Sequence, residues 1–335
     1  MRESWSPPKV HLNILSSNGG MGDLIARIPA IKYMLEASPH TSTTVYWQDY
    51  FVELARYLLP EHERLKHGAI GDAKWNMARP IIEFDMERLT TLQLHLTDHA
   101  FLILMDQMPP DDESRFYPAA PVVVRAGLNY MMKDAGLATA PYIVFTIGYT
   151  SNTRRWPAAH INTLAKRVRQ HGLTPVLLGT TKKLNVGLEG DYIKAGVDED
   201  IDRSLFVDLV DRTSLIECLG IIQRARAVVG VDNGLLHLAH CTDVPVVAGF
   251  TSLDPKHRVP YRRWPGGRAG DWSVHGLTKV ITASTPCING KPHCQSEGFA
   301  INQDWRSCIF GDYACTLEMS SSQFETALKK LNVLP

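Results

Sequence analysis

Three separate stretches of this chain carry residues that could bind an anion or move a proton. Asp23 follows a glycine-rich turn, Arg154 and Arg155 follow an apolar run, and Asp232 and His237 follow another. A carboxylate can accept a proton, and adjacent guanidinium groups can hold a phosphate through parallel hydrogen bonds. Together these residue types indicate a pocket for a phosphorylated molecule.

The stretch 228–245 is the most informative of the three. Its apolar start predicts a strand covered on both faces, as in parallel sheets, and a turn of Asp232, Asn233 and Gly234 leads into a helix with Leu235 and His237. Ligands bind at the carboxyl edge of such sheets, and helix N-termini favour anions. The alternatives are that Asp232 only caps its helix and that His237 is a buried core histidine.

The glycine-rich turn before Asp23 is not a dinucleotide fingerprint. The pattern G-x-G-x-x-G would need a glycine where Ile25 stands. We expect Gly20 and Gly22 to let the backbone approach a ligand closely. Two interpretations of Asp23 stay open: a helix cap, or a general base that the helix N-terminus keeps ionised.

Arg154 and Arg155 come at the end of a predicted strand, directly before a helix predicted over Ala158–Gln170. At that edge of a parallel sheet the two side chains could grip a diphosphate. The alternative is a solvated loop in which Trp156 packs into a domain interface. A second basic run, residues 256–268, also follows a strand, and it is either a solvated face or part of the cleft.

Composition and charge limit the classes of function that this chain can have. The chain has 335 residues, 44% of them hydrophobic, and a formal net charge of zero, so it can form two domains and gives no global signal for nucleic acid. The first eight residues lack a signal-peptide core, and no apolar run reaches membrane-spanning length. We expect a cytoplasmic protein.

Four cysteines near the C-terminus are the only metal candidates that the sequence offers. They have the spacing C-x6-C-x13-C-x6-C, which is not the close-paired pattern of a zinc ribbon. Free thiols, a zinc site and disulfides all fit it. No acidic pair stands where a cation on a bound phosphate would need ligands, so we expect no metal. The four are Cys287, Cys294, Cys308 and Cys315.

Strands and helices alternate along the chain, which predicts two doubly wound parallel sheets facing a cleft. Helices are expected at residues 51–59 and 120–135, with a further helix from the glycine-rich turn to about residue 37 that Pro29 breaks or kinks. We place an N-terminal domain at residues 1–138 and a C-terminal domain at 139–335, with a Cys-rich segment at 285–316. Predicted strands are 10–16, 43–47, 79–84, 101–104, 142–148, 175–179, 205–210, 227–232 and 245–250.

Three motifs in the same order resemble glycosyltransferase family 9, whose best-known members are ADP-heptose:lipopolysaccharide heptosyltransferases. They are SSNGGMGDLIARIPAI at residues 16–31, RRWPAAHINTLAKRV at 154–168 and VVGVDNGLLHLAHCTDVPVVAGFTSLDP at 228–255. The chain departs from the family at Asn233, where threonine is usual, and at Lys182 and Lys183, where heptosyltransferases carry acidic residues.

The resemblance implies a GT-B architecture of two Rossmann-like domains, with the acceptor on the first and a nucleotide-diphosphate sugar on the second. It implies inverting transfer with no metal and no cofactor. The acceptor would be a glycan such as lipopolysaccharide core, with peripheral membrane contact through it. By the same resemblance Asp23 is the general base, Arg154 and Arg155 neutralise the leaving diphosphate, and the donor site is formed by Asp232, Asn233, Gly234, Leu235 and His237.

Three other functions fit the same pocket. The chain could be a GT-B sugar-nucleotide epimerase or hydrolase, or a non-catalytic module that binds a nucleotide-sugar. It could also transfer a sugar to a nucleic-acid hydroxyl in modified-base DNA, for which the basic run at 256–268 would supply the contacts.

Overall fold

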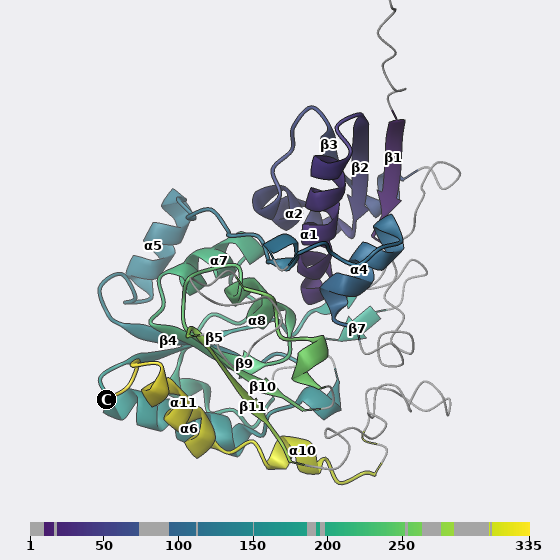
Figure 1. Ribbon diagram of the computed structural model, residues 1–335. Helices are drawn as coiled ribbons and strands as arrows, with labels where there is room; N and C mark the ends of the chain where they lie inside the picture. Colours follow the sequence, from purple (N-terminus) through teal and green to yellow (C-terminus); the bar gives the residue numbers. More distant parts are fainter. Residues whose placement is uncertain are drawn as a thin grey trace, which may run out of the picture.

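The fold is described from a computed structural model, which covers residues 10–16, 19–73, 94–111, 113–149, 151–185, 192–194, 198–251, 254–262, 276–284, 308 and 310–335. Its N-terminal sheet has three parallel strands in the order β1-β2-β3. Its C-terminal sheet has six parallel strands in the order β11-β10-β9-β4-β5-β8. Figure 1 shows the two sheets side by side, with helices between them.

The N-terminal strands are β1 (Val10–Leu15), β2 (Thr41–Trp47) and β3 (Leu65–Ala69). Two helices follow their strands directly, α1 (Met21–Ala37) after β1 and α2 (Val52–Leu58) after β2. The predicted strands 10–16 and 43–47 and the helix 51–59 are therefore confirmed within two residues. The predicted strand 79–84 lies outside the described residues.

The C-terminal sheet has a buried centre, because every residue of β4, β9 and β10 is buried. This explains the unbroken apolar runs by which these strands were predicted. The strand at the β10 edge, β11, was not predicted from the sequence. The strands are β4 (Tyr142–Thr146), β5 (Thr174–Leu178), β8 (Val207–Asp208), β9 (Ala227–Val231), β10 (Val246–Phe250) and β11 (Thr278–Thr282).

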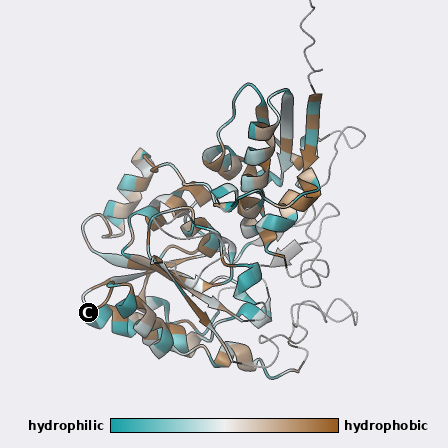
Figure 2. Ribbon diagram, in the orientation of Figure 1, coloured by the Kyte–Doolittle hydropathy of each residue, from teal (hydrophilic) through white to brown (hydrophobic). Residues whose placement is uncertain are grey.

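Helices cover both faces of the C-terminal sheet. On one face, Ile143 and Phe145 pack with α6 (Ala158–Gln170) and α11 (Ser321–Lys330). On the other, Val144 packs with α7 (Leu215–Gln223) and α8 (Gly234–Ala239) in a core that continues into α1 and α2. Figure 2 shows hydrophobic residues concentrated on the central strands and many hydrophilic residues on the outer helices.

Some elements differ from the sequence prediction. Residues 101–104 are not a strand; they belong to the helix α4 (Leu96–Met105), which packs against α1. Leucine, alanine and methionine, which favour helices, make up half of α4, and the His95 side chain accepts a hydrogen bond from the Thr97 amide as the helix cap. Pro29 does not break α1, because the buried residues on either side of it hold the helix in place. The alternative that Pro29 kinks the helix stays a prediction.

The helix predicted at 120–135 begins later, as α5 (Ala126–Asp134), and contacts α7 of the other sheet. The domain boundary at residues 138 and 139 stays a prediction. The remaining elements are a hairpin of β6 (Lys183–Asn185) and β7 (Tyr192–Lys194), the short helix α10 (Ala314–Leu317), and 3-10 turns. In the described part of the chain, no helix combines the length and apolar character needed to cross a bilayer.

Candidate active site at the domain interface

Close contact between α1 and α8 brings the first and third sequence motifs together. A Cβ atom on Gly22 would lie 2.7 Å from His237 Cδ2, and one on Gly234 would lie 2.8 Å from Met21 Cβ. The helices touch where side chains are missing, so the start of α1 faces the end of β9. This packing gives Gly22 a structural role, and its predicted approach to a ligand, like that of Gly20, stays a prediction.

Asp23 is both a helix cap and a residue of the domain interface. Its Oδ2 accepts a hydrogen bond from the Gly20 amide at 2.6 Å, which satisfies one of the free N–H groups at the start of α1. Its Oδ1 lies 3.3 Å from Arg258 Nη1 of the C-terminal domain, and the side chain is 20% exposed. The interpretation of Asp23 as a helix cap is confirmed. Its other carboxylate oxygen contacts an arginine of the C-terminal domain.

Asp232 lies among three positively charged or polar side chains. Arg154 Nη1 and Arg258 Nε are 3.6 and 3.7 Å from its Oδ2, and His237 Nε2 is 3.2 Å from its Oδ1. Burial alone would raise the pKa of Asp232, but the two guanidinium groups outweigh it and hold the pKa well below the ordinary value. We call Asp23, Arg154, Asp232 and Arg258 the Asp–Arg cluster.

The Arg154 guanidinium has a hydrogen-bond donor without a partner in the described structure. Its side chain is 13% exposed, and its ion pair with Asp232, at 3.6 Å, is longer than a hydrogen bond. Burial lowers the pKa of Arg154 from a value so high that the group stays charged. Among the described residues, its buried Nε has no hydrogen-bond partner. A guanidinium in this condition can bind an anion.

Arg155 has a different partner. Its Nε and Nη2 lie 2.7 and 2.6 Å from the two carboxylate oxygens of Asp198, a bidentate pair that raises the pKa of Arg155. The structure therefore does not bring Arg155 to Asp232 with its neighbour. Its role in phosphate binding stays a prediction.

His237 is held at both ring nitrogens. Its Nδ1 lies 3.1 Å from the Tyr117 hydroxyl and its Nε2 lies 3.2 Å from Asp232. Burial raises the pKa of Tyr117 well above its ordinary value, so the hydroxyl keeps its hydrogen and can donate it to Nδ1. His237 is buried, but as part of a polar network. No sequence motif pointed to Tyr117.

The Asn233 side chain is fully used inside the protein. Its Oδ1 accepts from the Leu236 amide at 3.0 Å as the N-cap of α8. Its Nδ2 donates to the carbonyl oxygens of Thr146 at 2.6 Å and Gly148 at 3.1 Å. The residue that departs from the family thus ties α8 to the end of β4. Gly234 and Leu235 begin α8, and their contact with a donor stays a prediction.

The described part of the basic run does not form an open basic face. Arg258 and Arg262 are 7% and 3% exposed. Arg262 donates to the carbonyl oxygens of Thr242 and Val244. Lys256 is exposed and pairs with Asp254 at 3.3 Å. Arg258 therefore lies where the two domains meet, and the expectation that the run is part of a cleft stays a prediction.

The backbone around Arg258 is fixed by α4. His257 Nδ1 donates to the Leu94 carbonyl at 2.8 Å, and His95 Nε2 donates to the Val259 carbonyl at 2.9 Å. Tyr261 and Asp98 form a further hydrogen bond. Arg258 thus extends from a segment that the N-terminal domain holds on both sides.

Two of the four C-terminal cysteines, Cys287 and Cys294, lie outside the described residues. Cys315 is buried, and Cys308 Sγ lies 3.7 Å from Asp312 Oδ1. In the described ranges, no three His, Cys, Asp or Glu side chains are placed to hold a metal ion.

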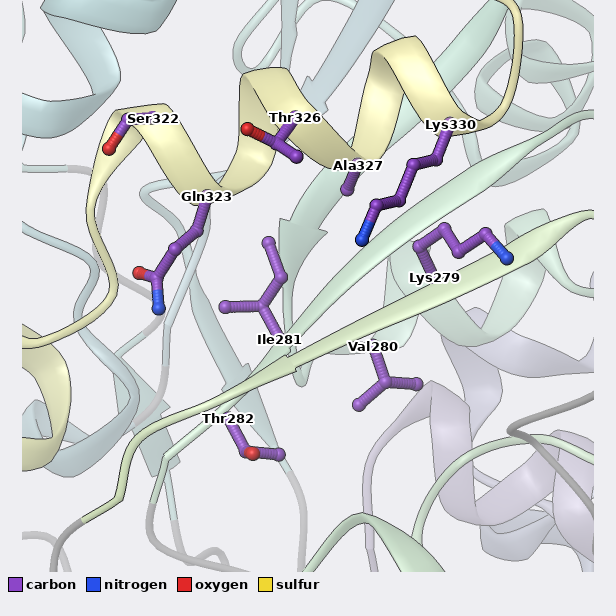
Figure 3. A pocket seen from close by; sticks show the side chains of 9 residues that line it. All are labelled: Lys279, Val280, Ile281, Thr282, Ser322, Gln323, Thr326, Ala327 and Lys330. Atoms are coloured by element: carbon purple, nitrogen blue, oxygen red, sulfur yellow. The ribbon is translucent and has the colours of Figure 1, made fainter.

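A groove lies at the other side of the C-terminal domain, between β11 and α11. Figure 3 shows Lys279 and Lys330 at one end and Ser322 and Gln323 at the other, with Ile281 between them. No residue of the Asp–Arg cluster lines it. The chemistry of the cluster, rather than this groove, identifies the candidate active site.

Comparison with known proteins places this cluster in a family context. Residues 117–265 match the sequence model of glycosyltransferase family 9 (heptosyltransferase). A stretch of 133 residues is 32% identical to lipooligosaccharide heptosyltransferase 2 of Haemophilus influenzae, covering 39% of this chain and 37% of that protein. A stretch of 148 residues is 32% identical to lipopolysaccharide heptosyltransferase 1 of Pseudomonas aeruginosa, covering 44% and 39%. The matches thus span well under half of these relatives.

Solved structures with the same fold cover nearly the whole chain. E. coli ADP-heptose lps heptosyltransferase II superposes with a TM-score of 0.62 at 14% identity, over 96% of this chain and 98% of that one. The family 9 glycosyl transferase from Veillonella parvula gives 0.60 at 14% identity, over 96% and 97%. The predicted GT-B fold and the resemblance to glycosyltransferase family 9 are confirmed.

Proposed function

We propose that this chain, with its family 9 region at residues 117–265, is a glycosyltransferase that moves a sugar from a nucleotide-diphosphate donor to an acceptor hydroxyl. The names of its relatives favour a heptose-type sugar and a lipopolysaccharide-type glycan acceptor. A protein that acts on such a glycan would work next to the membrane that carries it.

One observation carries the proposal: a carboxylate of one domain contacts an arginine of the other, and that arginine shares a second carboxylate with another arginine. Asp23 Oδ1 is 3.3 Å from Arg258 Nη1, and Arg258 and Arg154 both lie within 4 Å of Asp232. Group transfer between a hydroxyl and a phosphorylated sugar needs a base on one side and stabilisation of an anion on the other. Asp23 and the arginine pair supply these two functions.

The step is a single displacement at the anomeric carbon. Asp23 takes the proton of the acceptor hydroxyl, and the acceptor oxygen forms a bond to that carbon. The bond from the carbon to the diphosphate oxygen breaks, and its electron pair leaves with the nucleoside diphosphate. Arg154 and Arg258 stabilise the charge that develops there. One displacement of this kind inverts the configuration at the anomeric carbon.

We also propose that the reaction needs no metal and no cofactor. The two guanidinium groups can neutralise a diphosphate in place of a cation. Turnover that persists in the presence of a chelator would support this proposal. Loss of turnover, together with release of zinc, would overturn it and direct attention to the C-terminal cysteines.

The first experiment is a thermal-shift panel of nucleoside diphosphates and nucleotide-sugars on the full chain. A ligand that binds the folded protein raises its melting temperature, and at one fixed concentration the rise is larger for the tighter ligand, so the panel ranks base and sugar. A panel without any shift would contradict the proposal.

The second experiment measures turnover of the best donor with and without a glycan acceptor. Asp23→Asn should lower kcat by a factor of about 10²–10⁴, the usual contribution of a general base. Asp134→Asn, an exposed carboxylate on α5, is the control and should leave kcat unchanged. Unchanged turnover in Asp23→Asn would refute the base assignment. Product formation that ignores the acceptor would indicate a hydrolase or an epimerase instead.

A further inference from the structure

Arg258 is shared between two carboxylates from opposite domains. Its Nη1 is 3.3 Å from Asp23, and its Nε is 3.7 Å from Asp232. Charge-assisted pairs of this type are normally 2.7–2.9 Å long, and an arginine can hold one carboxylate with two such bonds. Both contacts of Arg258 are longer than this, and Arg258 holds neither carboxylate with two bonds. Its buried Nε lacks a hydrogen-bond partner among the described residues.

We propose that Arg258 is a switch between Asp23 and the diphosphate of the donor. When the donor binds, its diphosphate draws the Arg258 guanidinium away from Asp23 and leaves that carboxylate available to the acceptor hydroxyl. This inference rests on the proposed function, and it adds an order to it: the donor prepares the base.

The charges of the cluster explain why a diphosphate would compete for Arg258. The two carboxylates already balance the two guanidinium groups, so a diphosphate adds negative charge to a buried, neutral group of side chains. Arg154, with its own buried Nε lacking a hydrogen-bond partner in the described structure, can take part of that charge. Arg258 has to balance the remaining negative charge of the diphosphate, and to do so it must leave one of its two carboxylates.

Asp23 is the carboxylate that can release Arg258 more easily. It is 20% exposed and keeps the Gly20 amide as a partner at 2.6 Å. Asp232 is 5% exposed, so separating it from a counter-charge would cost more. The backbone of the Arg258 segment is fixed by His95 and His257, so the switch requires only a movement of the side chain.

Competition of this kind has a consequence for binding. If Asp23 and a diphosphate compete for Arg258, then removing the charge of Asp23 strengthens diphosphate binding, because linkage between two partners of one group is reciprocal. A purely structural ion pair would have the opposite result, since breaking it would loosen the site.

The test is calorimetric titration of the full chain with inorganic pyrophosphate and with ADP, GDP, UDP and CDP. Asp23→Asn should tighten binding about fivefold or more, the lower end of ordinary coupling between sites. Asp23→Asn keeps the cap, because the asparagine oxygen can still accept the Gly20 amide. Arg258→Met should weaken binding about tenfold or more, the cost of losing one charge-assisted contact.

The double variant separates the switch from simple repulsion between Asp23 and the ligand. With Arg258→Met in place, Asp23→Asn should have no further effect. The same tightening in both backgrounds would mean repulsion alone and would overturn the switch. So would a Kd that Asp23→Asn leaves unchanged or weakens. Arg258→Gln, which removes the charge but keeps a hydrogen-bond donor, replaces Arg258→Met if that variant does not fold.

Two further results complete the test. Lys256→Met removes an exposed charge two residues from Arg258 and should leave the Kd unchanged. If neither pyrophosphate nor any of the nucleotides binds the unaltered protein, the proposed function falls and the switch falls with it. If they bind and the cycle shows no coupling through Arg258, only the switch falls.

Discussion

At the scale of single residues, polar side chains of this site serve the fold and the chemistry together. Asp23 caps α1 with one oxygen and meets Arg258 with the other. Asn233 caps α8 and also donates to two carbonyl oxygens at the end of β4. Asn233, where the resembled family usually has threonine, therefore has a structural role of its own.

Asn233→Thr should destabilise the protein by about 1–2 kcal/mol, because two side-chain to backbone hydrogen bonds are lost. A threonine hydroxyl can still cap the helix, but it has one hydrogen to donate and a shorter reach. Chemical denaturation gives the free energy of unfolding directly.

Asn233→Asp is the matched control for that variant. It keeps the cap but turns a carboxylate oxygen toward the carbonyls of Thr146 and Gly148, so it should cost more than Asn233→Thr. If Asn233→Thr is as stable as the unaltered protein, the two donated hydrogen bonds contribute nothing to stability.

At the scale of elements, α1 and α8 pack closely at the candidate site because each has a glycine where they touch. The space at Gly22 is taken by the His237 ring, which Tyr117 and Asp232 hold at both nitrogens. The ring cannot turn aside without breaking one of these contacts. The approach of the helices therefore sets how close Asp23 comes to the C-terminal domain.

Gly22→Ala should destabilise the protein by about 1–3 kcal/mol, the usual cost of overpacking. Helix propensity alone would favour alanine by about 1 kcal/mol, so a loss would show that the contact with His237 outweighs it. The measurement is again the free energy of unfolding from chemical denaturation.

Gly127→Ala is the control, since Gly127 lies in α5 and a Cβ there meets nothing within 4 Å. It should stabilise the protein by up to about 1 kcal/mol. A gain of stability in both variants would contradict the close packing of α1 against α8.

At the scale of the whole molecule, one apolar core continues from the C-terminal sheet through α7 and α8 into α1 and α2. The Asp–Arg cluster lies at this junction, with both of its arginines and Asp232 nearly buried. Charges in such a position are held by one another, and removing one leaves its partner without compensation. The stability of the protein is thereby linked to the charge state of the interface.

Stability should fall in acid partly through Asp232. Its pKa is lower in the folded protein than in the unfolded chain, because Arg154 and Arg258 outweigh the effect of burial. Above pH 3.9, which is about the pKa of Asp in the unfolded chain, Asp232 makes its full contribution to the free energy of unfolding. That contribution is lost as the pH falls from there through the pKa of Asp232 in the folded protein. That contribution is on the order of 2 kcal/mol.

Unfolding free energies measured between about pH 6 and pH 3 check this linkage. Asp232→Asn should be less stable at neutral pH and should lose less of its stability in acid. Asp208→Asn is the control. Asp208 is 30% exposed and its partner Arg203 is 42% exposed, so solvent screens this ion pair. An equal acid slope in all three proteins would show that Asp232 does not carry the effect.

The sequence by itself determined the elements that local pattern fixes. Unbroken apolar runs identified β4, β9 and β10, because strands of a parallel sheet are covered on both faces. The helix predicted over Ala158–Gln170 has the same bounds in the structure. The order of three short motifs also sufficed to predict the GT-B fold and the resemblance to glycosyltransferase family 9.

Only the tertiary structure decided which partners the charged side chains have. Asp23 and Arg258 are 235 positions apart, and Tyr117 and His237 are 120 apart. Arg155, which stands beside Arg154 in the sequence, pairs with Asp198 instead of Asp232. Local pattern says which side chains reach a sheet edge, whereas the pairing of charges depends on how helices from distant parts of the chain pack. That packing places Arg258 between the two carboxylates.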